Sequence, residues 1–479
     1  MRTPGLVSRL PLWVHAVALA IIVAAVYGPD VGRGFSKDDF RWIVASRVRS
    51  AGDLKRLFVD TTGFYRPMVS LSFAANERLG GANPMGYGLT NLALALATAV
   101  AIAFLARGLQ LPMGACLFAA GVWLMNFHGI NMAVLWISGR TALLLTLFAV
   151  LSAIAASRGR PAAAALLAFA AMLSKEEAVL LPVALIVILA LTTRARLPAE
   201  AHTTPRAKVG LPVVLAMVYC AAAEIGYLFL RRHSNAMTPG TAPDFYQFVF
   251  APAAVFQNVL QYADRAATLT ALLLILLLAI TRKRPALDRA ERSAVTIGAA
   301  WVLAGFAVTV FLPVRSSLYA CFPSVGVALA GAAVASALWR AGPPERRRLA
   351  AVVALILPFL LIPIYRQRNG RWVELAVLSS NVTPALQEAA RIAGPDGNIL
   401  IVDDRSTRVS MLNTFGFLLA DAVELTSAQR PTVWLVPPQP GTATLDVPRR
   451  FESAWALRDG RLERVDGAGW VGSGANVLH

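Results

Sequence analysis

The chain contains little charge and little cysteine for its length. Only 15% of its 479 residues are charged, whereas soluble globular proteins carry nearer a quarter. A protein that water solvates along most of its length is therefore excluded. The three cysteines, Cys116, Cys220 and Cys321, all lie in apolar stretches. They indicate small buried hydrophobic residues rather than a disulfide framework or a cysteine-based metal site.

Apolar residues take the place of the missing charge. They make up 57% of the chain, and the mean hydropathy is +0.59. A spanning helix needs roughly 20 apolar residues, and we count about eleven such stretches. They lie near 11–28, 85–106, 111–127, 131–156, 161–174, 178–193, 209–230, 266–281, 293–312, 318–339 and 349–365. The sequence therefore predicts an all-α polytopic membrane protein.

Acidic residues are scarce as well, since the chain has 27 Asp and Glu residues and 45 Lys and Arg residues. A net charge of +18 would suggest nucleic acid as the partner of a soluble protein. Here the basic residues gather in alternate loops, which is the positive-inside pattern of membrane proteins. The cytoplasmic loops would hold Arg107, Arg158, Arg160, Arg194, Arg196, Arg206, Lys208, Arg282, Lys283, Arg284, Arg289, Arg292, Arg340, Arg346, Arg347 and Arg348.

This pattern places the N-terminus in the cytoplasm and the C-terminus outside. The first apolar stretch lacks a convincing small-residue cleavage site, so we interpret it as a retained helix. We expect a multi-pass protein of a plasma membrane, in a bacterium the inner membrane. Its partners would include membrane lipid and no nucleic acid.

Two domains are expected. Residues 1–369 form the transmembrane domain, including a long first outside loop at 29–84. Residues 370–479 form a small extracytoplasmic α/β domain. The pattern there predicts a helix over 384–393, buried strands over 398–402 and 432–436, and a hairpin turn at 458–461.

An acidic pair, Asp38-Asp39, follows the first apolar stretch. Aspartate is favoured at a helix start, where it accepts free backbone N–H groups, so helix capping is one interpretation. The other is a general base or a metal ligand, because a carboxylate that takes the proton of an alcohol helps it to attack a sugar. The pair Asp403-Asp404 follows a strand, and we assign it to a loop. The Gly467–Gly472 segment matches GxGxxG, but no helix follows it, so we reject a dinucleotide site.

Four polar motifs lie at the outer ends of apolar helices. They are Tyr65-Arg66-Pro67, Ile137-Ser138-Gly139-Arg140, Ser174-Lys175-Glu176-Glu177, and Arg315 with Tyr319. Each has a structural interpretation as an interfacial pair, a helix start or a paired charge. Together they predict one extracytoplasmic site for an anion, since arginine forks suit phosphate and an unpaired charge among apolar residues is costly.

The order of these motifs resembles a known family. It is similar to the type-C (GT-C) fold of membrane glycosyltransferases, in particular the membrane region of the tetratricopeptide-associated protein O-mannosyltransferases and their bacterial relatives. The motifs above match that family's pattern in order, as do Asn83-Pro84 with Tyr87 and Asn91, and Arg368-Asn369 with Trp372. The resemblance covers about 30–375. The chain departs from the pattern at Met132 and Val314, where the family often has Glu, and it lacks the tetratricopeptide tail.

The resemblance implies transfer of a sugar from a polyprenyl-phosphate donor to an acceptor hydroxyl of a protein, glycan or lipid, on the outer face. Asp38 or Asp39 would be the catalytic base, direct attack would invert the anomeric centre, and one of the two aspartates would hold a divalent metal if one is required. Arg66, Arg140, Lys175 and Arg315 would bind the donor phosphate. The supporting residues would be Tyr65, Asn91, His128, Glu176 and Tyr319.

Two other classes of function compete with this interpretation. A transporter or flippase for a lipid-linked anionic substrate predicts inverted repeats and polar sites at the bilayer midplane. We find no such symmetry in the sequence. A non-catalytic membrane assembly protein, anchored for its C-terminal domain, would not need the aspartates and the cations to converge.

Overall fold

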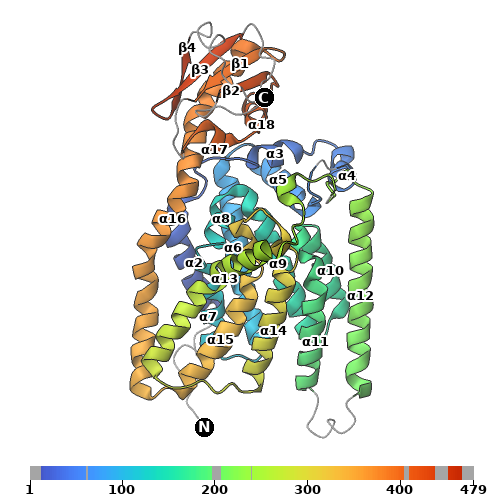
Figure 1. Cartoon of the computed structure of the whole chain (residues 1–479), viewed down its shortest axis with the longest axis vertical. Coiled ribbons are helices and arrows are strands. Elements are labelled where there is room, and N and C mark those ends of the chain that lie inside the picture. Colours follow the sequence, from blue (N-terminus) through green and yellow to red (C-terminus); the bar gives the residue numbers. More distant parts are fainter. Residues whose placement is uncertain are drawn as a thin grey trace.

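The chain forms an upright helical bundle with a small α/β domain at one end (Figure 1). The computed structural model describes residues 12–60, 63–196, 206–238, 240–403, 409–436 and 451–465. The described N-terminal helix lies in the bundle. The four-stranded sheet lies beyond the upper end of the bundle in this view.

A helix lies in each apolar stretch that the sequence suggests. These helices are α2 (Leu12–Tyr27), α6 (Pro84–Gly108), α7 (Met113–Leu124), α9 (Arg140–Ser157), α10 (Pro161–Met172), α11 (Leu181–Arg196), α12 (Arg206–Arg232), α13 (Pro252–Thr281), α14 (Arg289–Phe306), α15 (Ser324–Ala341) and α16 (Pro344–Ala393). In the part of the chain that the structure describes, seven helices are long and apolar enough to cross a membrane. The chain is therefore a multi-pass membrane protein. The figure of eleven crossings stays a prediction, because α2, α7 and α10 are shorter and α14 is not among the seven.

Small residues bring neighbouring helices of the bundle close together. A Cβ atom at Gly298 of α14 would stand 2.4 Å from the carbonyl oxygen of Gly326 on α15, and one at Gly326 would meet Gly298 at the same distance. Such close backbone approach is typical of helix packing in lipid, where van der Waals contact drives association. Substitution of either glycine would push the two helices apart.

The segment that the sequence predicts as the first outside loop folds into three short helices, α3 (Asp39–Ala45), α4 (Ala51–Val59) and α5 (Pro67–Gly80). The sequence predicts an amphipathic interfacial helix at 40–45, and a helix is found there. Its apolar side packs against protein rather than lipid, because Phe40 and Ile43 are buried and the Phe40 ring stacks on Phe415 at 5.2 Å. The loop therefore packs against the C-terminal part of the chain.

The C-terminal domain carries a sheet in the order β2-β1-β3-β4. Its strands are β1 (Asn398–Val402), β2 (Thr432–Val436), β3 (Ser453–Arg458) and β4 (Arg461–Val465). The bounds predicted for the first two strands are confirmed. The predicted hairpin turn is confirmed as well, since Asp459 and Gly460 both have positive φ, as a two-residue hairpin loop requires. Two helices, α17 (Met411–Phe415) and α18 (Leu419–Ser427), complete the domain.

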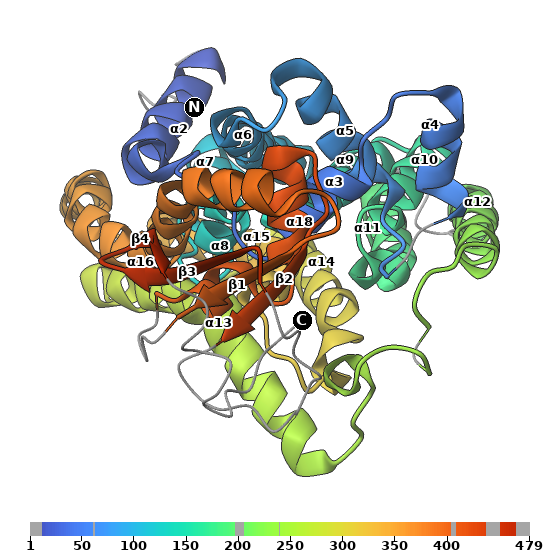
Figure 2. The ribbon, with the colours of Figure 1, turned by 90° about the horizontal axis from the view of Figure 1, so that it is seen from above.

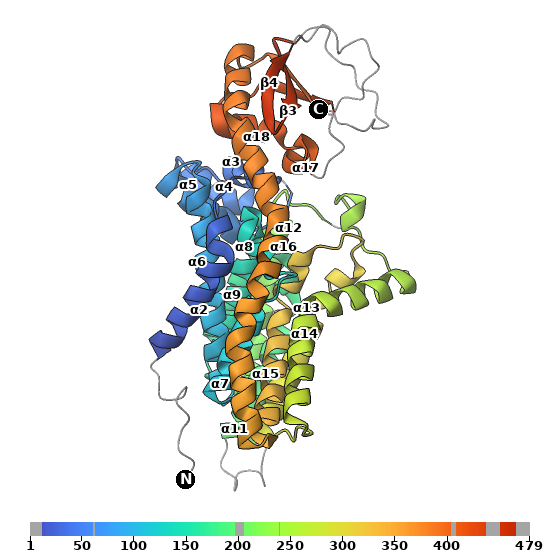
Figure 3. The ribbon, with the colours of Figure 1, turned by 90° about the vertical axis from the view of Figure 1, so that its left-hand side faces the viewer.

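Helix α16 joins the two domains without a break. It runs for 50 residues, through the predicted helix at 384–393. The boundary that we expected at 369/370 lies inside it, so the division into two domains stays a prediction. Seen from above, the sheet and α18 lie over the upper end of the bundle (Figure 2). In the side view, one part of α13 runs down the bundle and the other part projects sideways from the bundle, below the level of α3 and α5 (Figure 3).

Candidate functional site

Asp39 is buried and fully engaged at the upper end of the bundle. Its Oδ2 atom accepts the Ser36 N–H at 2.8 Å. Its Oδ1 atom accepts both the N–H and the hydroxyl of Ser138, which lies where α8 (Ile130–Leu135) gives way to α9. Burial raises the pKa of Asp39 to about 7, although these hydrogen bonds oppose the shift. The capping interpretation therefore fits Asp39, which ties the outside loop to a broken membrane helix.

Asp38 differs from its neighbour in its exposure and in its hydrogen bonds. It occupies the N-cap position of α3, yet its side chain makes no capping hydrogen bond, and it is exposed. The surrounding protein raises its pKa by desolvation, and Arg66, then Lys37 and Arg41, oppose the rise. Asp38 is thus a carboxylate held close to cations with its oxygens available to an incoming group.

Arg66 stands beside Asp38 and is already paired. Its guanidinium donates two hydrogen bonds to Glu176 Oε2, at 3.1 and 2.8 Å, and its Cζ lies 3.9 Å from the centre of the Phe64 ring. Arg231 contacts the other oxygen of Glu176 at 3.5 Å. Glu176 therefore bridges the start of α5 and the end of α12. The sequence did not suggest Arg231, because its partner is distant in the chain.

Lys175 and Glu177 form a second, buried ion pair. The ammonium group of Lys175 also lies 4.7 Å above the ring of Tyr319. Its sequence position suggested that Ser174 caps the following helix. This prediction is wrong, because the hydroxyl of Ser174 donates back to Ala170 O. The charge of Lys175 is compensated within the protein.

Arg140 is completely buried and serves the packing of the bundle. It donates to Asn91 Oδ1 at 2.9 Å, to the carbonyl and hydroxyl oxygens of Ser72 at 3.1 Å, and to the carbonyl of Tyr87 at 2.9 Å. Asn91 in turn donates to four carbonyls at the break between α8 and α9, Ala133, Val134, Trp136 and Ile137. This saturation by protein acceptors argues against contact with a donor phosphate.

Arg315 has amide partners rather than acidic ones. It donates to Asn258 Oδ1 at 2.7 Å and to Gln257 Oε1 at 2.8 Å, both on α13. Tyr65 is buried beside Tyr227, with ring centres 6.1 Å apart. Its hydroxyl finds no hydrogen-bond partner within the described part of the chain.

His128 belongs to a separate group of residues that the sequence did not bring together. It lies between α7 and α8, where its Nε2 atom is 4.0 Å from Asp264 Oδ2 of α13. Burial and the guanidinium of Arg368 lower the pKa of His128, Asp264 opposes them, and Arg265 lowers it further. Two arginines, one from α13 and one from α16, therefore lie near the imidazole of His128. The resemblance suggested His128 as a supporting residue and matched Arg368-Asn369 to the family pattern, but it did not connect them with Arg265.

No cluster of three or more His, Cys, Asp or Glu side chains suited to a metal ion occurs among the residues that the structure describes. Asp39 has both oxygens occupied by protein donors, so Asp38 stands as a single carboxylate. We derive no step through a metal ion.

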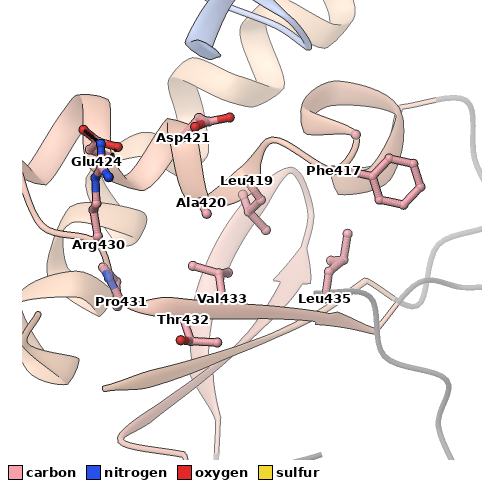
Figure 4. A pocket seen from close by; sticks show the side chains of 11 residues that line it. Phe417, Leu419, Ala420, Asp421, Glu424, Arg430, Pro431, Thr432, Val433 and Leu435 are labelled. Atoms are coloured by element: carbon pink, nitrogen blue, oxygen red, sulfur yellow. Dashed lines mark hydrogen bonds and ion pairs between the residues drawn. The ribbon is translucent and has the colours of Figure 1, made fainter. Parts of the chain in front are cut away.

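A cavity of 350 Å³ lies in the C-terminal domain, between α18 and β2 (Figure 4). Its walls are largely apolar, with Phe417, Leu419, Val433 and Leu435 among the lining residues. None of the polar residues around Asp38 lines it. Asp421, on its rim, accepts a hydrogen bond from Arg41 of α3 at 3.2 Å, so the cavity lies near the outside loop but apart from the aspartates.

No protein-family model and no curated protein matches this chain. Solved structures to which it is similar include the apo oligosaccharyltransferase of Archaeoglobus fulgidus, with 10% identity and a TM-score of 0.46 over 88% of this chain and 64% of that one. They also include ArnT from Cupriavidus metallidurans bound to undecaprenyl phosphate, with 14% identity and a TM-score of 0.45 over 90% and 86%. Apo ArnT gives 14% identity and a TM-score of 0.47 over 88% and 85%. Similarities this low carry no argument about the activity of this chain.

Proposed function

We propose that this chain is a membrane glycosyltransferase that moves a sugar from a polyprenyl-phosphate donor to an acceptor hydroxyl on the outer face of the membrane. The observation that carries the proposal is the contrast between the two aspartates. Asp39 is buried and engaged, whereas Asp38 is exposed, uncapped and close to Arg66. Asp38 is therefore free to accept a proton beside a cation, while its neighbour Asp39 anchors the segment.

The chemistry follows from this arrangement. Asp38 accepts the proton of the acceptor hydroxyl, whose oxygen forms a bond to the anomeric carbon of the sugar. The bond from that carbon to the phosphate oxygen breaks, and its electron pair leaves with the lipid phosphate. Attack opposite to the leaving group inverts the anomeric centre.

Asp39 acts through position rather than by touching the substrate. Its hydrogen bonds to Ser36 and Ser138 hold the first turn of α3, and with it Asp38, against the membrane helices. The polar clusters around Asp38 gather near one end of the bundle, which supports this function over a transporter with sites at the midplane.

The experiment compares surface glycoproteins and glycans by mass spectrometry in cells that lack the chain and in cells that carry variants of it. Wild type should restore a missing sugar modification, and Asp38→Asn should not. The matched control is Asp60→Asn, because Asp60 is another exposed aspartate of the outside loop, whose side chain accepts a hydrogen bond only from Asn235 among the described residues. Restoration by Asp38→Asn, with normal protein levels, would overturn the proposal.

A further inference from the structure

The cations near the candidate site fall into two groups with different charge balance. In the first group, Glu176 pairs with Arg66 and Arg231, and Glu177 pairs with Lys175. Three cations thus face two acids, in contacts that are already made. In the second group, Arg265 and Arg368 approach His128, with Asp264 as the nearest acid.

The second group is built from three separate segments. Arg368, on α16, places its Cζ 4.4 Å from the centre of the Phe127 ring, and that ring lies 4.7 Å from the ring of His128. Arg265, on α13, lies 5.9 Å from the centre of the Tyr262 ring. Aromatic faces therefore position both guanidinium groups and leave their N–H donors for another partner.

Most of the hydrogen-bonding capacity of the two arginines is unused among the residues that the structure describes. Arg265 makes one long contact, 3.5 Å from Nη2 to Gln261 Oε1, and its buried Nη1 has no partner among the described residues. Asp264 compensates little, because its side chain is 59% exposed and 4.0 Å from His128. Cations that approach one another with unused donors are costly unless an anion joins them.

The state of His128 suits an anion with oxygen acceptors. Burial and the two arginines lower its pKa, so the imidazole is neutral at neutral pH and one of its nitrogens carries a proton to donate. An arginine fork together with an N–H donor matches the oxygens of a phosphate group.

The group is also connected to Asp38. Lys37, next to Asp38 in the chain, places its ammonium 5.8 Å from the Trp372 ring. Trp372 lies one helical turn after Arg368 on α16. A phosphate held by Arg368 would therefore lie across from the proposed base.

The surface beside Arg265 is suited to a lipid rather than to a free phosphate. The first part of α13 projects sideways from the bundle, below the level of α3 and α5 (Figure 3). It exposes Phe256, Val259 and Leu260, and the downward half exposes Leu272 and Ile275. An isoprenoid chain could lie along this apolar surface while its phosphate reaches Arg265.

We infer that Arg265, Arg368 and His128 form the seat of the donor's lipid phosphate, in place of Arg66, Arg140 and Lys175. This inference rests on the proposed function and names the residues that bind its leaving group. When the bond to the sugar breaks, the new charge on the phosphate oxygen develops beside two guanidinium groups.

The test measures binding of undecaprenyl phosphate to purified protein in detergent, with separate titrations of undecaprenol, phosphatidylglycerol and inorganic phosphate. Wild type should bind undecaprenyl phosphate more tightly than the other three. Arg265→Gln and Arg368→Gln should each weaken this binding about tenfold or more, since each removes a charge-assisted hydrogen bond. The control Arg232→Gln, which removes an exposed arginine at the end of α12, should bind as wild type does.

The other outcomes are distinguishable. Asp38→Asn should bind undecaprenyl phosphate normally, so normal binding by both Arg265→Gln and Arg368→Gln would overturn the seat and leave the proposed function standing. Equal binding of phosphatidylglycerol or inorganic phosphate would assign the site to a phospholipid headgroup or a free anion and overturn it as well.

If a glutamine variant fails to fold, Arg265→Lys and Arg368→Lys, which keep the charge but lose the fork, should bind more weakly than wild type. Binding as tight as wild type by both would overturn the seat. Loss of binding in the arginine variants without any change of surface glycans in cells lacking the chain would retain the seat and reject the glycosyltransferase.

Discussion

Glu176 receives both hydrogen bonds of the Arg66 fork, at 3.1 and 2.8 Å, across 110 positions of sequence. Because Glu176 neutralises part of the charge of Arg66, this ion pair should weaken the electrostatic effect of Arg66 on Asp38. The Arg66 guanidinium is the first of the cations that hold down the pKa of Asp38 against desolvation. We therefore expect substitutions of Arg66 and of Glu176 to shift the pKa of Asp38 in opposite directions.

The first prediction concerns the pH dependence of transfer. A base must be deprotonated, so activity should fall as pH drops through the pKa of Asp38, which lies above its ordinary value. Arg66→Gln removes a cation and frees the charge of Glu176, so the acid limb of the pH–rate profile should move to higher pH. Glu176→Gln should move it to lower pH. The neighbouring charges of Lys37 and Arg41 are unchanged in both variants, and shifts in the same direction would contradict this account.

The second prediction separates the two aspartates by stability. Asp39→Ala leaves three donors from Ser36 and Ser138 without their acceptor, at a cost of about 1–3 kcal/mol for each buried donor. Thermal unfolding in detergent should show a clear drop in Tm. Asp38→Asn should change stability by less than about 0.5 kcal/mol, as is usual for an exposed position, while it lowers transfer by about 100-fold or more. An equal loss of stability in the two variants would contradict the division of roles.

The third prediction concerns Arg140. Arg140→Met should lower the folded yield and the Tm, because Asn91, Ser72 and Tyr87 each lose a buried donor. The protein that does fold should bind undecaprenyl phosphate as tightly as wild type does. A stable variant with weakened lipid binding would return Arg140 to the donor site.

The fourth prediction is the orientation of the chain. A reporter that is active only outside the cell, inserted after Gly394 where α16 ends, should be active. The same reporter inserted near residue 201, which lies outside the described residues, should be silent. An insertion after Gly370 would interrupt α16 and is avoided. The reverse pattern would place the aspartates in the cytoplasm and remove the site from the outer face.

Local sequence patterns were sufficient to predict the helices and strands. The contacts of the site residues could not be predicted, because they join segments that are distant in the sequence. The strands at 398–402 and 432–436 follow from short apolar runs, which need no knowledge of their partners. The ion pair of Arg66 with Glu176 joins segments that no periodicity relates. Arg140 was expected to face a ligand because an unpaired charge in lipid is costly, but the backbone carbonyl of Tyr87 and the side chain of Asn91 compensate it.

The second cation group was hidden for a related reason. Arg265 lies in a helix that begins at Pro252, whereas the apolar run alone suggested a helix from 266 onward. Arg368 lies on α16, far from Arg265 in sequence. Their convergence on His128 depends on how α13 and α16 pack, which composition and spacing do not determine.

Helix α16 has a mechanical consequence. It contains Pro363 and Pro384, and each proline removes one backbone hydrogen bond, so the helix bends most readily at these two levels. The segment between the two prolines carries Arg368 and Trp372. A tilt of this segment about Pro363 would move the guanidinium of Arg368, whereas a tilt of the sheet about Pro384 would leave it in place.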